Sequence, residues 1–406
     1  KKNTFLLGLF GDTMQRIYAD GKPNLGKSLP EDWLRPAKKM NHRSVKRIIQ
    51  LINDIRADVD KQVQQPRKEK LDGFIRLFIA DRASDKSKIE VEVGKKMAII
   101  TKDDLWLNED KVQALILEHH MAALRMGFVG LFEPLYKVDR FRTSLLDGTL
   151  SSLNIFTKTI LPLVLAKQEK DKFAIARLIK AKSPLFHKQK IEESKDQIKY
   201  LTEIQNHVES LLELWNDEKD PLLSNILKVI YSTNLFPLSG VLKVIASRTE
   251  KELRAIDDEE KNEYQDETEQ PSDEVIDAWD LCLEVPFSQV VNYNNYISDD
   301  SRFATHQGVK GLEYDRVSVI IDDAEARGFL FSYDKLFGAK DLTETDINNQ
   351  AEGKDTGVDR TRRLFYVACS RAKESLAIIA YTDKPEIVKE NAKAYGWFKE
   401  GEIEIF

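Results

Sequence analysis

Apolar residues gather into short, strongly hydrophobic runs near both ends of the 406-residue chain. Such runs, closed by polar or turn residues, are typical of buried strands. They predict strands at 5–12, 74–80, 97–101, 316–321 and 376–382. Two other segments, 45–55 and 362–374, repeat their apolar positions every three or four residues, which indicates helices.

The middle of the chain has a different pattern. From about residue 110 to 283 apolar positions follow the helical period almost throughout, and few β-branched runs interrupt them. The stretch 250–274 carries twelve acids against three bases and few apolar residues, so we expect a loop or weak helix ends there. Strands at both ends and helices between them predict an α/β domain interrupted by a mainly α-helical insertion.

Composition places the chain among globular proteins, with 42% hydrophobic and 32% charged residues and a net charge of −6. This charge excludes a uniformly basic nucleic-acid-binding surface but allows a local one, because 167–190 holds eight basic residues against two acids. No apolar run is long enough to span a membrane. The only cysteines, Cys282 and Cys369, suit a reducing compartment, so we expect a cytoplasmic location.

Residues 21–28, "GKPNLGKS", fit the phosphate-loop pattern G-x-x-x-x-G-K-[ST]. A working loop of this kind follows a strand directly and opens a helix several turns long. Here the preceding apolar run ends about ten residues earlier, and Pro30 and Pro36 leave room for only a short helix. We therefore expect an ordinary loop. A self-contained NTPase that uses this loop is retained as a third hypothesis.

Four segments resemble, in order, the later motifs of superfamily 1 helicases of the UvrD/Rep/PcrA type. They are "GDTMQRIY" (11–18), "MNHRS" (40–44), "THQGVKGLEYDRV" (305–317) and "DRTRRLFYVACSRAKESL" (359–376). The last two together are highly specific. The resemblance implies a RecA-like parallel-sheet domain, split by the helical insertion, in the C-terminal half of a helicase.

The resemblance also implies domain limits. Residues 1–29 would end a first RecA-like domain, and residues 30–115 and 290–406 would form a second one around an insertion at 116–289. The nucleotide would be ATP with Mg²⁺, and the phosphate loop and Mg²⁺ ligands would lie upstream of this chain. No metal site is expected within it, because the adjacent His119 and His120 would point apart on a helix.

Five residues would serve the nucleotide by this resemblance. Arg43 and Arg371 would bind the γ-phosphate oxygens from across an interdomain cleft, since a planar guanidinium can bind two oxygens at once. Gln15 would orient water or report hydrolysis, and Glu313 would accept from a ribose hydroxyl. His42 stands where the family has a tyrosine that stacks on adenine. We expect Arg371 to lie on the helix-like segment and to point outward.

For DNA, the resemblance assigns Tyr18 to base stacking, Thr305 and Gln307 to phosphate hydrogen bonds, and Lys310 to phosphate charge. Several positions depart from the family pattern. Gln307 replaces a histidine, Ser370 replaces a threonine, and a Trp-Arg pair expected after Tyr18 is missing. We expect these changes to affect the binding of the DNA strand more than the hydrolysis of ATP.

The sequence leaves rival functions open. One is a motor that moves 3′ to 5′ along single-stranded DNA, or DNA with a 3′ tail, with a nuclease or repair protein as a possible partner. Another is a DNA- or partner-binding module that kept the fold without the motor. The joint presence of Gln15, Arg43, Glu313 and Arg371 favours the motor, because a binding module needs no γ-phosphate ligands.

Overall fold

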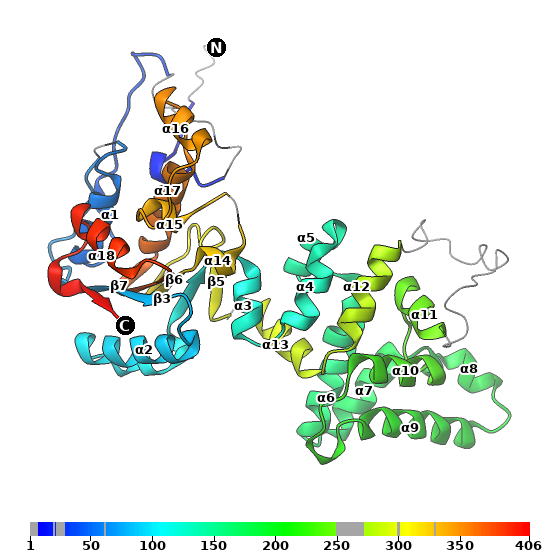
Figure 1. Cartoon of the computed structure of the whole chain (residues 1–406). Helices are drawn as coiled ribbons and strands as arrows, with labels where there is room; N and C mark the ends of the chain where they lie inside the picture. Colours follow the sequence, from blue (N-terminus) through cyan, green and yellow to red (C-terminus); the bar gives the residue numbers. More distant parts are fainter. Residues whose placement is uncertain are drawn as a thin grey trace, which may run out of the picture. The chain divides into compact units, whose positions relative to one another are not determined.

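The computed structural model describes residues 7–18, 21, 29–60, 62–248, 272–298, 301–328 and 330–406. It separates into two compact units, one formed by Lys1–Ala122 with Arg302–Phe406 and the other by Ala123–Ser301 (Figure 1). The second unit is therefore inserted in the first. The sequence placed this insertion at 116–289.

The first unit is built on a parallel six-stranded sheet of order β5-β4-β6-β7-β3-β8. The long central strands are almost fully buried, as expected where helices cover both faces of a parallel sheet. The expected α/β fold with a parallel sheet is confirmed. The strands are β3 (Phe74–Asp81), β4 (Gln113–Ile116), β5 (Phe303–Thr305), β6 (Tyr314–Ile321), β7 (Ala372–Thr382) and β8 (Ile403–Ile405). A separate pair joins β1 (Met40–Asn41) and β2 (Gln65–Pro66).

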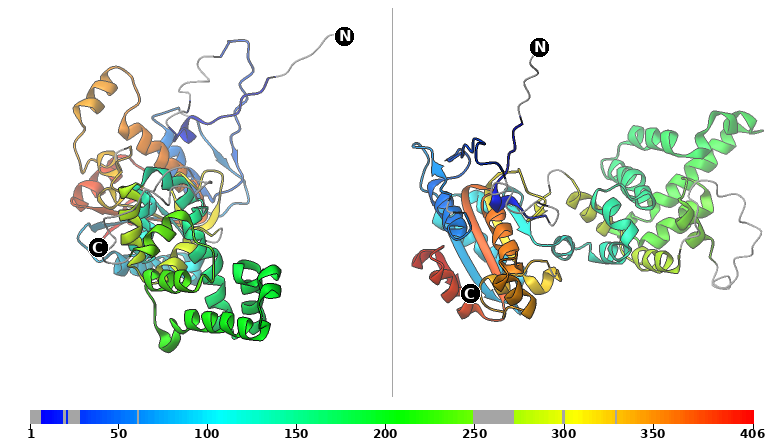
Figure 2. Two further views of the ribbon diagram at one scale, coloured as in Figure 1. Left: turned by 90° about the vertical axis from the view of Figure 1, so that its right-hand side faces the viewer. Right: turned by 90° about the horizontal axis from the view of Figure 1, so that it is seen from above.

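Helices α1 (Lys46–Arg56) and α17 (Gly357–Cys369) lie side by side over the strands (Figure 2). Helix α2 (Lys86–Thr101) lies on the opposite face of the sheet (Figure 1). A capping box between Thr356 and Asp359 satisfies the first backbone N–H groups of α17. The remaining helical segments of this unit are η1 (Thr13–Gln15), η3 (Asp104–Leu107), η4 (Glu109–Lys111), α14 (Asp323–Ala326), α15 (Tyr333–Leu336), α16 (Glu344–Ala351), α18 (Pro385–Ala394) and η11 (Glu400–Glu402).

The second unit is helical, and α3 (His119–Arg125) spans the boundary that leads into it. Large buried side chains such as Phe128, Phe132, Trp279 and Tyr293 form its core. Its segments are α4 (Val129–Lys137), η5 (Asp139–Phe141), α5 (Arg142–Leu146), η6 (Ser151–Leu153), η7 (Phe156–Ile160), α6 (Leu161–Gln168), α7 (Lys172–Lys182), η8 (Pro184–Phe186), α8 (Lys188–Glu193), α9 (Gln197–Glu213), η9 (Asn216–Glu218), α10 (Leu223–Thr233), α11 (Gly240–Ser247), α12 (Asp273–Leu283) and α13 (Ser288–Tyr296).

Three local expectations were wrong. Residues 97–101 are not a strand but the last turns of α2, which ends at Lys102 in the left-handed conformation. Residues 113–116, expected to be helical, form β4 in the sheet. Residues 7–12 form no strand, because the described part of the chain places no neighbouring strand beside them and Asp12 instead caps η1.

Other expectations fall outside the described residues. Residues 22–28 of the phosphate-loop pattern and 250–271 of the acidic stretch belong to this group, whereas Asp273 and Glu274 already open α12. In the described ranges, no single helix is long and apolar enough to cross a membrane. Only the bent pair Asp139–Leu146 and Ser151–Gln168, taken together, has that length and composition.

Candidate nucleotide and DNA site

Three of the predicted nucleotide residues meet at the amino ends of the central strands. Glu313 directly precedes β6 and Arg371 directly precedes β7, and the Tyr314 N–H donates to the Arg371 carbonyl at 2.9 Å. Arg43 lies between β1 and α1. Its segment is tied to β7 because the Ser44 hydroxyl donates to the Ala372 carbonyl at 2.7 Å. Three segments that are far apart in the sequence therefore lie together at the amino ends of β6 and β7.

Arg43 links the other two residues. Its Nε donates to Glu313 Oε2 at 2.9 Å, and its Nη1 donates to the Ser370 carbonyl, next to Arg371, at 3.0 Å. The hydrogen bond and charge of Arg43 lower the pKa of the Glu313 carboxyl. Burial, together with the positive charge of Arg43, lowers the pKa of Arg371 to about 10. The cluster thus holds two guanidinium groups against one carboxylate.

This excess of positive charge fits a phosphate chain. A bound phosphate would compensate the repulsion between Arg43 and Arg371, and guanidinium groups match phosphate oxygens geometrically. Glu313, whose side chain is 50% exposed, remains open to accept a hydrogen bond from a ribose hydroxyl. Arg43 and Glu313, whose side chains are 27% and 50% exposed, are accessible to the nucleotide that the resemblance implied.

The expected orientation of Arg371 was wrong. Helix α17 ends at Cys369, so Arg371 lies in the turn before β7, and only 3% of it is exposed. Its guanidinium donates to the carbonyls of Val367 at 2.9 Å and Leu312 at 3.2 Å, and to the Ser370 hydroxyl at 2.7 Å. The reason is that backbone carbonyls of the helix end at Val367 and of the distant loop at Leu312 face inward, and the arginine satisfies both.

Gln15 and His42 are the other two predicted nucleotide residues. Gln15 donates from Nε2 to Asp12 Oδ2 at 3.1 Å, and none of the hydrogen bonds among described residues joins it directly to Arg43, Glu313 or Arg371. His42 is exposed and directly precedes Arg43. The structure thus pairs Arg43 with Glu313 and places Arg371 within electrostatic reach of both, whereas Gln15 is bonded to Asp12.

The predicted DNA residues form a second group. The Tyr18 hydroxyl donates to the Gln307 carbonyl at 3.3 Å, and the Lys310 ammonium lies 5.3 Å from the centre of the Tyr18 ring. Thr305 Oγ1 accepts from the Gly308 N–H at 3.0 Å, which shapes the loop that carries Gln307 and Lys310. Tyr18 is 47% exposed. A half-exposed ring beside a cation can stack on a base while the lysine meets a phosphate.

His306 is a residue that motif reasoning passed over. It is fully buried beneath the same loop, where one ring nitrogen contacts the Leu115 carbonyl at 3.1 Å and the other the Tyr333 hydroxyl at 2.9 Å. Burial lowers its pKa to about 4, so the ring is neutral at pH 7. His306 therefore anchors the loop between Thr305 and Glu313. In the sequence, only its position directly after Thr305, inside a motif, could have indicated this role.

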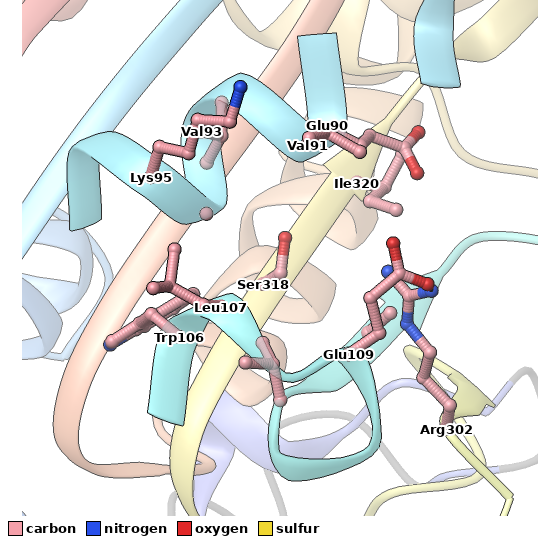
Figure 3. Close-up of a pocket in the computed structure, with 13 residues that line it drawn as sticks. Glu90, Val91, Val93, Lys95, Trp106, Leu107, Glu109, Arg302, Ser318 and Ile320 are labelled. Atoms are coloured by element: carbon pink, nitrogen blue, oxygen red, sulfur yellow. The ribbon is translucent and has the colours of Figure 1, made fainter. Parts of the chain in front are cut away.

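A cavity of about 150 Å³ lies elsewhere, between α2, η3 and β6 (Figure 3). Val93, Trp106 and Ile320 line it, and none of the predicted site residues does. The parts of the chain that the structure describes contain no group of three or more His, Cys, Asp or Glu side chains that could hold a metal ion.

Comparison with known proteins identifies the family of the chain. The family model described as UvrD-like helicase C-terminal domain matches residues 34–383, and the chain belongs to this family. The expected helicase resemblance and RecA-like fold are thereby confirmed.

A curated relative extends the comparison. The chain is 25% identical over 408 residues to the Gabija protein GajB of Bacillus cereus (strain HuB5-5). This match covers 96% of the chain but 56% of the relative, so the chain spans little more than half of that protein's length.

Proposed function

We propose that the whole protein hydrolyses ATP when bound to DNA and uses it to move 3′ to 5′ along single-stranded DNA. The observation that carries this proposal is the Arg43–Glu313–Arg371 cluster, where two guanidinium groups face one carboxylate. Because DNA phosphates would also balance this charge, its assignment to ATP rests on the helicase motifs in which the three residues lie. The family supports a helicase role, and the direction of movement rests on the resemblance.

In this proposal the chain supplies phosphate ligands from one side of the nucleotide. Arg43 and Arg371 stabilise the charge that develops on the transferring phosphoryl group. Arg371 does so by exchanging its bond to the Leu312 carbonyl for one to a phosphate oxygen. Glu313 holds the ribose, His42 lies against the base, and Gln15 orients water.

The other nucleotide ligands come from a separate part of the protein. The phosphate loop and the Mg²⁺ ligands are assigned to a preceding RecA-like domain. Bound Mg²⁺ would neutralise phosphate charge there. Domain limits of 30–115 and 290–406 around the insertion belong to the same proposal.

Tyr18, Thr305, Gln307 and Lys310 form the DNA side of the proposal. The loop that holds Thr305, Gln307 and Lys310 also carries Leu312 and Glu313, and the Leu312 carbonyl accepts a hydrogen bond from Arg371. Tyr18 is joined to this loop by its bond to the Gln307 carbonyl. Nucleotide and DNA residues therefore share one short segment. A change in the bonds of Arg371 on ATP binding would therefore reach the residues that hold DNA. This connection is what a translocating motor requires.

The biological setting is also a proposal. From the likeness to the Gabija protein GajB, we propose that the chain belongs to a GajB-like protein. Its partner would be a nuclease or a repair protein. Cys282 and Cys369 are free and buried, in accord with the cytoplasmic location that we propose. The partner would be sought by co-purification with the whole protein.

The direct test measures ATP hydrolysis and movement by the whole protein. We expect hydrolysis to be stimulated by single-stranded DNA, and streptavidin to be displaced from a 5′-biotin end but not from a 3′-biotin end. Displacement from the 3′ end would reverse the proposed direction. Tight DNA binding without any hydrolysis would contradict the motor and favour the binding-module hypothesis.

A further inference from the structure

A continuous hydrogen-bond network connects Gln15 with the backbone of Arg43. It starts where Asp12 accepts from the Gln15 amide at 3.1 Å and, through its other oxygen, from Arg56 Nη2 at 3.1 Å. Arg56 Nη1 then donates to the Tyr366 hydroxyl at 3.2 Å. The motif segment that carries Gln15 is thereby joined to α1 and α17.

The network continues from Tyr366 toward the arginine cluster. The Gln64 amide donates to the Tyr366 hydroxyl at 2.7 Å and accepts from Asn41 Nδ2 at 2.7 Å. Asn41 Oδ1 accepts from the backbone N–H of Arg43 at 2.9 Å. We call the five residues between the two ends, Asp12, Arg56, Tyr366, Gln64 and Asn41, the Tyr366 network.

Burial and charge hold the centre of this network, Arg56 and Tyr366, in place. Arg56 is 2% and Tyr366 1% exposed, and Arg56 makes a second ion pair with Asp60 at 2.6 Å. Burial raises the pKa of the Tyr366 hydroxyl to about 12, so it stays a neutral acceptor of both hydrogen bonds. Arg56 and Tyr366 are therefore held in one geometry, because displacing either would leave a buried group without a partner. Asp12, Gln64 and Asn41 are partly buried.

We infer that Tyr366 and Arg56 are positioning residues that fix the distance between Gln15 and Arg43 during ATP hydrolysis. The inference rests on the proposed function, since Gln15 and Arg43 act on the nucleotide only if that function holds. Neither Tyr366 nor Arg56 touches the nucleotide in this account. Each acts through the side chain or backbone at its end of the network.

The test uses Tyr366→Phe in the whole protein, with Tyr293→Phe as its matched control. Tyr293 is equally buried, and its hydroxyl donates to the Leu145 carbonyl at 2.6 Å in the helical unit. Both variants lose a buried hydroxyl, so both should lower Tm by a few degrees. Only Tyr366→Phe should lower kcat, by roughly three- to tenfold, with KM for ATP changed less than about twofold.

A second pair of variants separates positioning from packing. Arg56→Lys keeps the positive charge but cannot reach both Asp12 and Tyr366, whereas Arg47→Lys changes a buried arginine of the same helix that pairs with Glu402. We expect Arg56→Lys to lower kcat and Arg47→Lys to lower only Tm. Adding Tyr366→Phe to Arg56→Lys should not lower kcat further, because both cut the same connection.

The outcomes separate this inference from the proposed function. Equal kcat in Tyr366→Phe and Tyr293→Phe, or full additivity of Tyr366→Phe with Arg56→Lys, overturns the network while Arg43→Ala still abolishes hydrolysis. A parent protein without DNA-stimulated hydrolysis overturns the proposed function, and the positioning role with it.

Discussion

Arg43 and Glu313, which are 270 positions apart in the sequence, form a direct ion pair with 2.9 Å between Nε and Oε2. Arg43 lies shortly before α1 and Glu313 directly before β6. Arg371, directly before β7, interacts electrostatically with both. This pair leaves one guanidinium charge uncompensated in the cluster. An anion binding here would restore the balance, which is the physical basis of the nucleotide assignment.

Glu313→Gln tests the ribose role. The amide keeps the shape of the side chain but loses the charge that attracts a ribose hydroxyl, so KM for ATP should rise roughly tenfold, as for a lost charged hydrogen bond. We expect kcat to stay within about threefold, because the phosphate ligands are intact. Glu374→Gln, at an exposed position of β7, is the control and should change neither constant. An unchanged KM in Glu313→Gln would remove Glu313 from the site.

Tyr18 and Lys310 should contribute to DNA binding in different ways. Tyr18→Ala should weaken binding of single-stranded DNA by about 1–3 kcal/mol, the value of one stacked base, while Tyr18→Phe should bind normally. Lys310→Gln should reduce the slope of log affinity against log salt by roughly one phosphate contact. Fluorescence anisotropy at several salt concentrations measures both effects. A Tyr18→Phe variant as weak as Tyr18→Ala would show that the hydroxyl, not the ring, matters.

The Arg47–Glu402 pair should stabilise the sheet domain in a pH-dependent manner. Both Arg47 Nε and Nη2 donate to the Glu402 carboxylate, at 2.8 and 2.7 Å, and both side chains are buried. Burial would raise the pKa of Glu402, but the hydrogen bonds from Arg47 and Lys399 outweigh it and lower the pKa. The stabilisation is therefore complete above the unfolded-state pKa, about 4.3, and is lost as pH falls through the folded-state pKa.

Glu402→Gln should accordingly lower the free energy of unfolding by roughly 3 kcal/mol at pH 7, because it leaves a buried arginine without its carboxylate. The difference from the parent should shrink below about pH 4. Glu400→Gln, which affects only an exposed pair with Lys393, is the control. A difference that stays constant from pH 7 to pH 3 in denaturant titrations would argue against the ion pair as its cause.

The phosphate-loop pattern at 21–28 should have no catalytic role. Lys27→Ala in the whole protein should leave kcat and KM for ATP unchanged, since the pattern lacks the strand and long helix of a working loop. The residue lies outside the described part of the chain, so its assignment rests on sequence. Hydrolysis lost in Lys27→Ala would favour the hypothesis of a self-contained NTPase.

The sheet was predictable where its strands are long and apolar. Residues 74–80, 316–321 and 376–382 became the central strands because their apolar runs are buried on both faces. Strands β4 and β5 have four and three residues, too few to show a period, and their place in the sheet depends on partners far along the chain. The run at 97–101 is as apolar as a buried strand, but it lies within helix α2, which begins after the Asp85 cap and ends at Thr101.

The site was predictable in its residues more than in its contacts. The motifs identified Arg43, Glu313 and Arg371, and the structure brings them together. The buried direction of Arg371 could not be read from the sequence, because it depends on carbonyls of the distant loop at Leu312. The Tyr366 network was missed for a similar reason, since its polar members show no spacing pattern.

Arg371→Lys provides the most direct test of the account, through kcat for ATP hydrolysis by the whole protein at saturating single-stranded DNA. A lysine keeps the charge but cannot bind two phosphate oxygens, and an arginine on a transferring phosphoryl group contributes on the order of 10³–10⁵ in rate. We predict that kcat falls by about 10³ or more, while Arg362→Lys, on the partly exposed face of α17, stays at the parent value. A kcat of Arg371→Lys within a few-fold of the parent would contradict the assignment of Arg371 to the nucleotide.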